Sequence, residues 1–503
     1  MTKSADTGLT DCTENQPPWV DPDLPPDQFL YDRMGPWPQP APAYPMTQPP
    51  EVLNIPTSED VAWWEWIGSR VVADYFVAKL EAPGHAKTDL TLPLPTDYEF
   101  LQMMTRTVYA RYLRNESAGS AYWVSDFTAM ELIDPLPGMY CAPVICRFQL
   151  QDTVFSCVSI TFLKTPTRIR ELVVTPTDKA WNLAKIYACQ GAAYHALFVV
   201  HPALHFPMDS VNAITKTAVP QIHPLFQAIF PHTTYTLKLD NAVLEGEDTI
   251  VNKTAPTTAW DPLTANGYNL KQLFGVGYSG YKGLAAYPPY DYMKPWMNSE
   301  TLYGMCLRQY FKPFLAFATK IASVIPKTDP YVKRWADYCS AHVHGFPDGS
   351  AIFDGANLAR TLAIYMWDVS VAHGADHYSF GYDIPMKDKF LRIRRPPPED
   401  INDGGDVQKV GDVANLDDMT RAETAKIMFF NVFTLSPNLI DTTYVFKDAT
   451  LQAAATQFHA DLKSIDVEVR NRMPEFMCLE RNLDPFNGPI IVYEWTIPAS
   501  IQF

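Results

Sequence analysis

Two pairs of histidines in apolar stretches constrain this chain more than any other feature of its sequence. His201 and His205 lie in the segment YHALFVVHPALHFP, and His373 and His377 lie in LAIYMWDVSVAHGADHYSF. Residues four positions apart in an α-helix differ by only about 40° of rotation, so each pair would point in one direction. The sequence therefore predicts two core helices, each of which presents two imidazoles to the interior.

Four imidazoles that meet in a core suit a transition metal such as iron or manganese better than a hard cation. The alternative is that these histidines are satisfied by core or interface contacts, and the spacing alone does not decide between the two interpretations. The zinc-protease motif HExxH is excluded, because no glutamate follows His201.

The formal charge and the hydropathy of the chain narrow the classes of partner. A net charge of −16 argues against a nucleic-acid partner, which would demand a basic patch. We expect no transmembrane segment and a cytoplasmic location, because the chain has neither an apolar signal core nor an apolar run of about 20 residues. The 8 cysteines form no CxxC pair, which indicates reduced thiols rather than a thiolate zinc site.

The chain divides at about residue 56. Residues 1–56 hold 13 of the 44 prolines, and proline withholds backbone donors, so this part is predicted to be an extended arm. Residues 57–503 are predicted to form one mostly α catalytic domain with a small β region.

Within that domain, hydrophobic periodicity and turn residues predict the elements. Strands are predicted over residues 142–150, 154–162 and 172–174. Helices are predicted over residues 59–80, 179–200, 302–324, 330–342, 355–377, 421–433 and 451–469. The polar segment 396–418 is expected to be a long surface loop, and the aromatic-rich segment 278–296 an irregular wall over the core.

Four segments resemble conserved segments of the lipoxygenase family, and they occur in the family's order over roughly residues 120–503. They are residues 174–185 (VTPTDKAWNLAK), 223–232 (HPLFQAIFPH), 394–398 (RRPPP) and 497–503 (IPASIQF). The first resembles the start of the family's metal-bearing helix, and the last resembles its C-terminus. The resemblance implies the fold of a lipoxygenase catalytic domain with metal-bearing core helices, here without the N-terminal β-barrel lipid-binding domain.

The resemblance also implies a metal-ligand set. His205 matches the second histidine ligand of the first helix, and His373 matches the third histidine. His377 matches a position held by asparagine or histidine, and Phe503 would supply the C-terminal carboxylate. The implied cofactor is non-heme iron, with manganese as the alternative.

The chain departs from the family at the first ligand. The family places that histidine five residues before the second, across a π-type widening of the helix. Here that position is Val200, and His201 follows it. Because Pro202 removes a backbone hydrogen bond and crowds the preceding turn, a local distortion is expected to aim His201 inward as a ligand.

Other departures concern the predicted substrate pocket. The terminal residue is phenylalanine rather than isoleucine, and the position that biases oxygen insertion in the family falls on Val243. The glutamine network that links metal to substrate in the family would fall near Ala196 and Phe380. These three positions are candidate pocket residues, whereas His195, His223 and His232 are expected to be structural or supporting residues.

The implied activity is a dioxygenase reaction. A metal-bound hydroxide would abstract hydrogen from a polyunsaturated fatty acid, and O2 would add to give a hydroperoxide. Two alternatives remain open at this stage: an oxygenase of the same fold acting on a non-lipid natural-product intermediate, and a scaffold that binds a lipid or partner without turnover. The expected partners are an apolar small molecule and O2.

Overall fold

The computed structural model describes most of the chain between residues 89 and 501. The described residues are 89–152, 154–166, 168–233, 267–297, 301–380, 384, 388–419, 422, 438–471 and 497–501. The predicted N-terminal arm, the predicted helix at 59–80, most of the predicted helix at 421–433, Val243 and Phe503 lie outside them.

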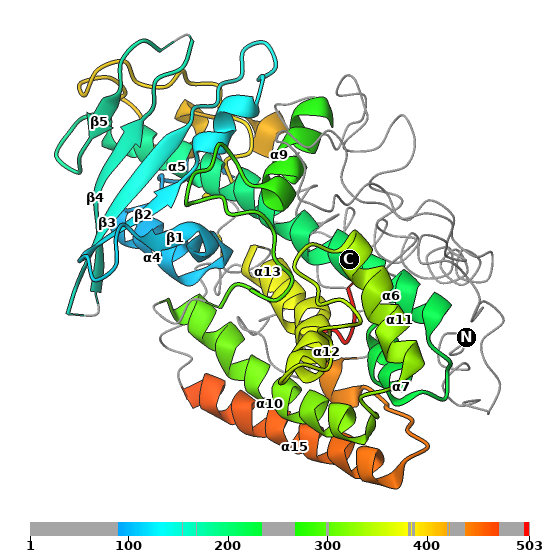
Figure 1. Cartoon of the computed structure of the whole chain (residues 1–503). Coiled ribbons are helices and arrows are strands. Elements are labelled where there is room, and N and C mark those ends of the chain that lie inside the picture. The colour runs from blue at the N-terminus through cyan, green and yellow to red at the C-terminus, as the bar shows by residue number, and fades with distance from the viewer. Residues whose placement is uncertain are drawn as a thin grey trace.

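A five-stranded antiparallel sheet forms one end of the molecule (Figure 1). Its strands follow chain order: β1 Leu113–Asn115, β2 Tyr122–Asp126, β3 Val144–Gln151, β4 Val154–Phe162 and β5 Leu172–Val174. The three predicted strands correspond to β3, β4 and β5, and the sequence pattern did not reveal the short β1 and β2. Val144, Cys146 and Phe148 alternate as the buried face of β3, as expected for a sheet covered on one side.

Helices make up most of the remaining described structure. Up to residue 279 the described helices are α4 Asp97–Arg106, η2 Val108–Tyr112, η3 Thr128–Leu132, α5 Trp181–His195, η4 Ala196–Val200, α6 His201–Ala218, α7 Pro224–Ile229, η5 Phe230–His232 and α9 Gly267–Ser279. From residue 302 onward they include α10 Leu302–Val324, α11 Pro330–His342, α12 Asn357–Trp367, η6 Asp368–Ala372, α13 His373–Tyr378, η9 Val410–Asp412, η10 Leu439–Asp441 and α15 Ala449–Asn471. The predicted mostly α fold with a small β region is confirmed, and α10 and α11 begin and end where the sequence pattern placed them.

The predicted helices at 179–200 and 355–377 need a correction. Neither is a continuous α-helix, because each contains a π-helical segment of five residues, η4 and η6 respectively. Each π-helical segment ends one residue before a histidine pair, so α6 and α13 both begin at a histidine. A hydrophobic pattern cannot reveal such a widening, because it changes the backbone bonding and leaves the apolar character of the segment intact.

The two interrupted helices occupy the middle of the molecule (Figure 1). The helix α10 packs along α12 on one side and along α15 on the other, while α11 packs on α6 and α9 on η4. A Cβ atom on Gly277 of α9 would lie 2.2 Å from the carbonyl oxygen of Val199, so only glycine allows this approach. Among the described residues, no helix combines the length and apolarity needed to cross a membrane.

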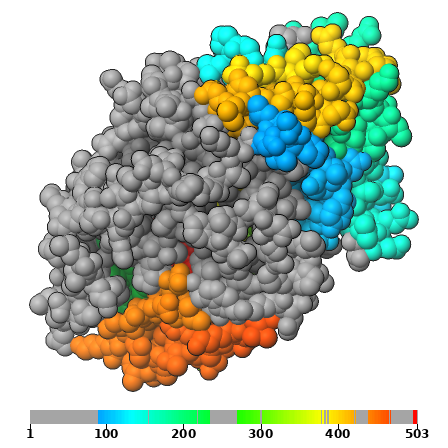
Figure 2. Space-filling view, turned by 180° about the vertical axis from the view of Figure 1, so that it is seen from behind, coloured from blue at the N-terminus to red at the C-terminus, as the bar shows by residue number. Residues whose placement is uncertain are grey.

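The predicted loop at 396–418 is mostly irregular, apart from the short helix η9 and a helical stretch at residues 416–419. It is not purely a surface loop, because Val407, Val410 and Val413 are buried. The backbone N–H of Leu94 donates to Gln408 at 3.2 Å and holds this loop beside α4. Figure 2 shows segment 388–419 over α4 and the strands at one end of the molecule, and α15 along the opposite edge.

The predicted aromatic wall over residues 278–296 is also irregular. Its tyrosines Tyr281, Tyr287 and Tyr292 are buried rather than displayed on the surface. The hydroxyl of Tyr292 donates to the carbonyl of Thr361 in α12 at 2.9 Å, which ties the wall to one of the two central helices.

Candidate metal centre

The backbone of each interrupted helix changes its bonding just before the histidines. The N–H of His201 bonds to the carbonyl of Ala196, five residues back, and the N–H of His373 bonds to the carbonyl of Asp368, also five residues back. At the first helix, Pro202 has no N–H, so the carbonyl four residues before it cannot be paired by the regular α pattern. Widening the turn before a proline is a known response, and it rotates the residues that follow.

The structure brings the four predicted histidines together. The Nε2 atom of His205 lies 2.9 Å from that of His201 and 2.8 Å from that of His373. The Nε2 atoms of His373 and His377 lie 3.0 Å apart, and one ring nitrogen from each of the four lies within 4.8 Å of all the others. The sequence expectation that each pair points into one pocket therefore agrees with the geometry, and the two pairs face one another.

These contacts cannot all be hydrogen bonds. An imidazole nitrogen carries either one hydrogen or one in-plane lone pair, yet the Nε2 atoms of His205 and His373 each face two neighbouring Nε2 atoms. A cation between the rings would use all four lone pairs at once. Metal–nitrogen bonds of about 2.1 Å put neighbouring nitrogens about 3 Å apart and opposite ones about 4 Å apart, so the four residues fit such an ion.

The electrostatics of the site favour neutral imidazoles, which are the form that binds a metal. Burial is the main cause, and it lowers the pKa of His205 to about 4 and that of His377 to about 3. Burial and the neighbouring imidazoles hold the pKa of His201 and of His373 well below the usual value. All four lone pairs are therefore available near neutral pH.

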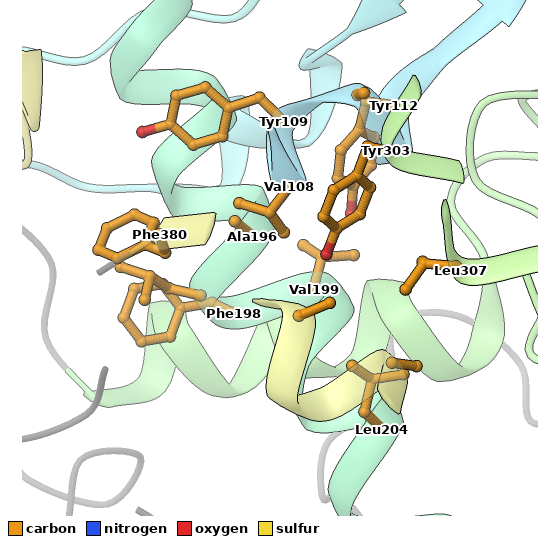
Figure 3. Packing of buried hydrophobic residues seen from close by; sticks show 14 of the residues in the cluster. Val108, Tyr109, Tyr112, Ala196, Phe198, Val199, Leu204, Tyr303, Leu307 and Phe380 are labelled. Carbon is orange, nitrogen blue, oxygen red and sulfur yellow. The ribbon is translucent and has the colours of Figure 1, made fainter. Parts of the chain in front are cut away.

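Two of the three predicted pocket residues lie in the part of the chain that the structure describes. Ala196 lies in η4, Phe380 follows α13, and both are buried. Figure 3 shows them in the buried hydrophobic cluster together with Val108 and Phe198. Ala196 and Phe380 are thus apolar residues of the buried core.

The other three histidines that the sequence drew attention to lie outside this cluster, and each has contacts of its own. His195 contacts the carbonyl of Gly191 at 2.7 Å and the hydroxyl of Tyr287 at 2.8 Å. His223 accepts the N–H of Leu225 at the start of α7 and lies 3.3 Å from Asp329.

His232 holds the described part of the C-terminal segment. Its Nδ1 atom is 2.5 Å from the carbonyl of Ala499, its Nε2 atom is 2.8 Å from the hydroxyl of Tyr444, and Ser500 donates to its carbonyl at 2.9 Å. The same segment lies against α13, because a Cβ on Gly374 would be 3.0 Å from the ring of Pro498. Residues 497–501 therefore run past the helix that bears His373 and His377.

The segments that resembled lipoxygenases fix the first helix in place. Lys185 of α5 donates to the carbonyl of Pro95 at 2.6 Å and to Asp97 at 2.8 Å. The hydroxyl of Tyr187 donates to the carbonyl of Arg395 at 2.6 Å, so segment 394–398 contacts the same helix. These contacts give a physical reason for motifs that carry no metal ligand.

Sequence reasoning missed a charged group beside the histidines. Asp376, between His373 and His377 in the chain, pairs with Arg111 of η2 at 2.9 Å and accepts a hydrogen bond from Tyr303 of α10. The sequence did contain a sign of this ion pair, since an aspartate in an apolar core helix needs a buried partner. The partner lies 265 positions away in the chain, and no local pattern reveals it.

The fold and the donor set define a helical protein with a candidate metal centre, and the comparisons with known proteins agree with the fold. No protein-family model matches the chain. Among curated proteins, the chain is 22% identical over 340 residues to the mouse polyunsaturated fatty acid lipoxygenase ALOX12, covering 59% of this chain and 47% of that protein. It is 24% identical over 391 residues to the rice putative lipoxygenase 5, covering 66% of this chain and 40% of that protein. A third relative is the mouse hydroperoxide isomerase ALOXE3, at 22% identity over 317 residues.

Solved structures give the same result for the fold. Coral 8R-lipoxygenase superposes with a TM-score of 0.63 at 14% identity, covering 88% of this chain and 76% of that one. The manganese lipoxygenase of Gaeumannomyces graminis superposes with a TM-score of 0.57 at 15% identity, covering 89% and 85%.

Two of these three curated relatives are named as lipoxygenases, and the fold is that of a lipoxygenase catalytic domain, so the resemblance inferred from the sequence is confirmed. The matched stretch spans less than half the length of the curated relatives.

Proposed function

We propose that this chain is a lipoxygenase-type dioxygenase that binds one non-heme iron or manganese ion and adds O2 to a polyunsaturated fatty acid. The proposed ligands are His201, His205, His373, His377 and the carboxylate of Phe503. The observation that carries the proposal is the convergence of four neutral Nε2 atoms within 4.8 Å of one another in a buried site. The lipoxygenase relatives support the substrate class.

When bound, the metal supplies the one-electron chemistry that removes hydrogen from an apolar substrate, and the chain supplies position and a dry surrounding. The four imidazoles stay neutral, so the site carries little charge of its own. Ala196, Phe198 and Phe380 are buried in the apolar core. We propose Ala196 and Phe380 as pocket residues, and Val243 stays a predicted one.

The role proposed for Phe503 rests on the segment that precedes it. His232 and Tyr444 hold residues 497–501 in place, and Gly374 admits that segment close to α13. A carboxylate would complete a set of four nitrogens with one hard, negative oxygen ligand, which stabilises a di- or trivalent ion.

A second candidate is an oxygenase of the same scaffold that acts on a different apolar substrate. Two departures favour it: His201 stands one position later than the family's first ligand, and the polar positions near substrate are replaced by Ala196 and Phe380. A third outcome, a scaffold that binds without turnover, would follow if the metal-loaded protein consumes no oxygen at all.

One experiment separates these functions. The protein is purified with an N-terminal tag, its metal is counted by mass spectrometry, and oxygen uptake is followed with linoleate and arachidonate. We expect about one iron or manganese per chain, and a conjugated-diene absorbance that rises in step with oxygen consumption. Full metal without oxygen uptake on several polyunsaturated acids would favour the second candidate, and stoichiometric zinc or no metal after reconstitution would overturn the proposal.

A further inference from the structure

A buried ion pair joins α13, the helix that bears the second histidine pair, to a distant part of the chain. The Nε atom of Arg111 donates to the Oδ1 atom of Asp376 at 2.9 Å, and the hydroxyl of Tyr303 donates to the same oxygen. The side chains are only 5% and 2% exposed, respectively. Arg111 belongs to η2, Tyr303 to α10 and Asp376 to α13, so one carboxylate joins three elements that are distant in the chain.

Asp376 stands three residues after His373 and directly before His377, so the ion pair attaches to the turn of α13 that carries both histidines. The guanidinium is held from another side as well, 5.3 Å from the ring of Trp296 and 5.9 Å from that of Tyr303.

Fold stability does not account for this arrangement. Three buried atoms of the group, Arg111 Nη2, Asp376 Oδ2 and Asp368 Oδ2, have no hydrogen-bond partner among the described residues. A buried ion pair with unsatisfied atoms adds little stability or none, and such exceptions concentrate where function requires charge.

Another buried carboxylate, that of Asp418, accepts hydrogen bonds on both of its oxygens. Asp418 accepts the Nε atom of Arg394 at 2.6 Å on one oxygen and its Nη2 atom at 3.0 Å on the other. Both oxygens of Asp418 are therefore used, in contrast to those of Asp376. This pair supplies a matched control away from the histidines.

We propose that Arg111, Asp376 and Tyr303 are positioning residues of the metal centre. By fixing Asp376 on α13, they set the rotation of that short helix, so that the Nε2 atoms of His373 and His377 face those of His201 and His205. The inference rests on the proposed function, since it assigns these residues to the metal that the histidines hold.

Binding of Mn2+ alone to the metal-free full-length protein tests this, with affinity from calorimetry and the electron paramagnetic resonance spectrum of bound Mn2+ as readouts. Tyr303→Phe removes one donor and no charge, and it should change the spectrum with a severalfold loss of affinity. Asp376→Asn should weaken binding by about 10–100-fold, the usual effect of removing a residue that supports a ligand.

The double variant Arg111→Met, Asp376→Leu guards against a mere folding defect, because it leaves no unpaired charge behind. We expect it to melt near the wild-type temperature, yet to bind Mn2+ more weakly and with an altered spectrum. The control Asp418→Asn should lower the melting temperature and leave the affinity and the spectrum of Mn2+ unchanged.

Wild-type affinity and an unchanged spectrum in both Tyr303→Phe and the double variant would overturn the inference while leaving the proposed function intact. A wild-type chain that takes up neither Mn2+ nor Fe2+ would instead overturn the proposed function, and the inference with it.

Discussion

The two helices that bear the histidines differ in the contacts that place each histidine pair. In α5–η4–α6 and in α12–η6–α13 alike, a π-helical segment of five residues ends just before a histidine pair with α-helical spacing. The first helix owes its widening to the backbone, through Pro202 and the close approach of Gly277 to Val199. The second helix has no proline in residues 357–378, and Asp376 is instead tied by Arg111 and Tyr303.

The solvent exposure of the four histidines also differs between the two helices. His373 is fully buried and His377 is 4% exposed, whereas His201 is only partly buried. A pair placed by backbone geometry needs few polar partners. A pair placed by a buried charge needs a partner from elsewhere in the fold.

The largest effect should come from the ligands themselves. We expect His205→Ala and His373→Ala to lose metal affinity by on the order of 100-fold or more, since a ligand should matter at least as much as the residues that support it. The two losses should be equal, because each helix contributes equally to the site. Metal content by mass spectrometry measures them, with His342→Ala of α11 as the control that keeps its metal.

Next in size is the effect of the chain end, which belongs to the second helix through Gly374. Residues appended after Phe503 convert the carboxylate to an amide and should reduce metal affinity by about 10–100-fold. Phe503→Ile keeps the carboxylate and should therefore keep the metal. Full metal content and full turnover in the extended chain would show that Phe503 is not a ligand.

Pro202→Ala tests whether the first helix is placed by its backbone. The alanine restores an N–H, so η4 is expected to relax toward regular α-helix and turn His201 away, with a loss of metal affinity of about tenfold. The free energy of unfolding should rise by about 1 kcal/mol, because proline is costly inside a helix. Calorimetry of metal binding together with denaturant unfolding measures both changes.

Pro313→Ala in α10 is the matched control, since it removes a helix proline that precedes no histidine. It should stabilise the fold without any change in metal affinity. If Pro202→Ala binds metal as the wild type does, the first helix is placed by its packing against α9 rather than by the proline.

The last expected effect is a pH dependence of the free energy of unfolding, to which one histidine of each region contributes. Burial lowers the pKa of His195, in the first helix, to about 3, and that of His232, which anchors the segment against the second, to about 4. Histidine in the unfolded chain takes up a proton near pH 6.5. Below that pH the unfolded chain therefore binds more protons than the folded chain. Stability should therefore fall as the pH drops from about 6.5 to 4, by about 3 kcal/mol for each residue.

Denaturant unfolding of the metal-free protein between pH 7 and 4 measures this loss. His195→Gln and His232→Gln should each flatten the profile by one residue's share, and the loss due to His195 should continue below pH 4. Profiles that remain parallel to the wild type in both variants would mean that these two histidines are protonated in the folded chain.

The sequence by itself predicted much of this molecule. Spacing and apolar context marked His201, His205, His373 and His377, and the same periodicity located α10 and α11 to the residue. These features are local, because one helical turn determines which side chains share a face. The short strands β1 and β2 escaped prediction, since three to five residues carry too little pattern and are stabilised mainly by pairing with β3.

Tertiary structure alone decided how the two histidine pairs face each other and what stands behind them. The π-helical segments depend on bonds between backbone groups, which a hydrophobic pattern does not record, although Pro202 gave a hint of the first. The pairing of Asp376 with Arg111 joins positions 265 residues apart, and neither side chain carries any local sign of the other. Burial makes that pairing necessary, because a charge removed from water must find its opposite wherever the fold brings one near.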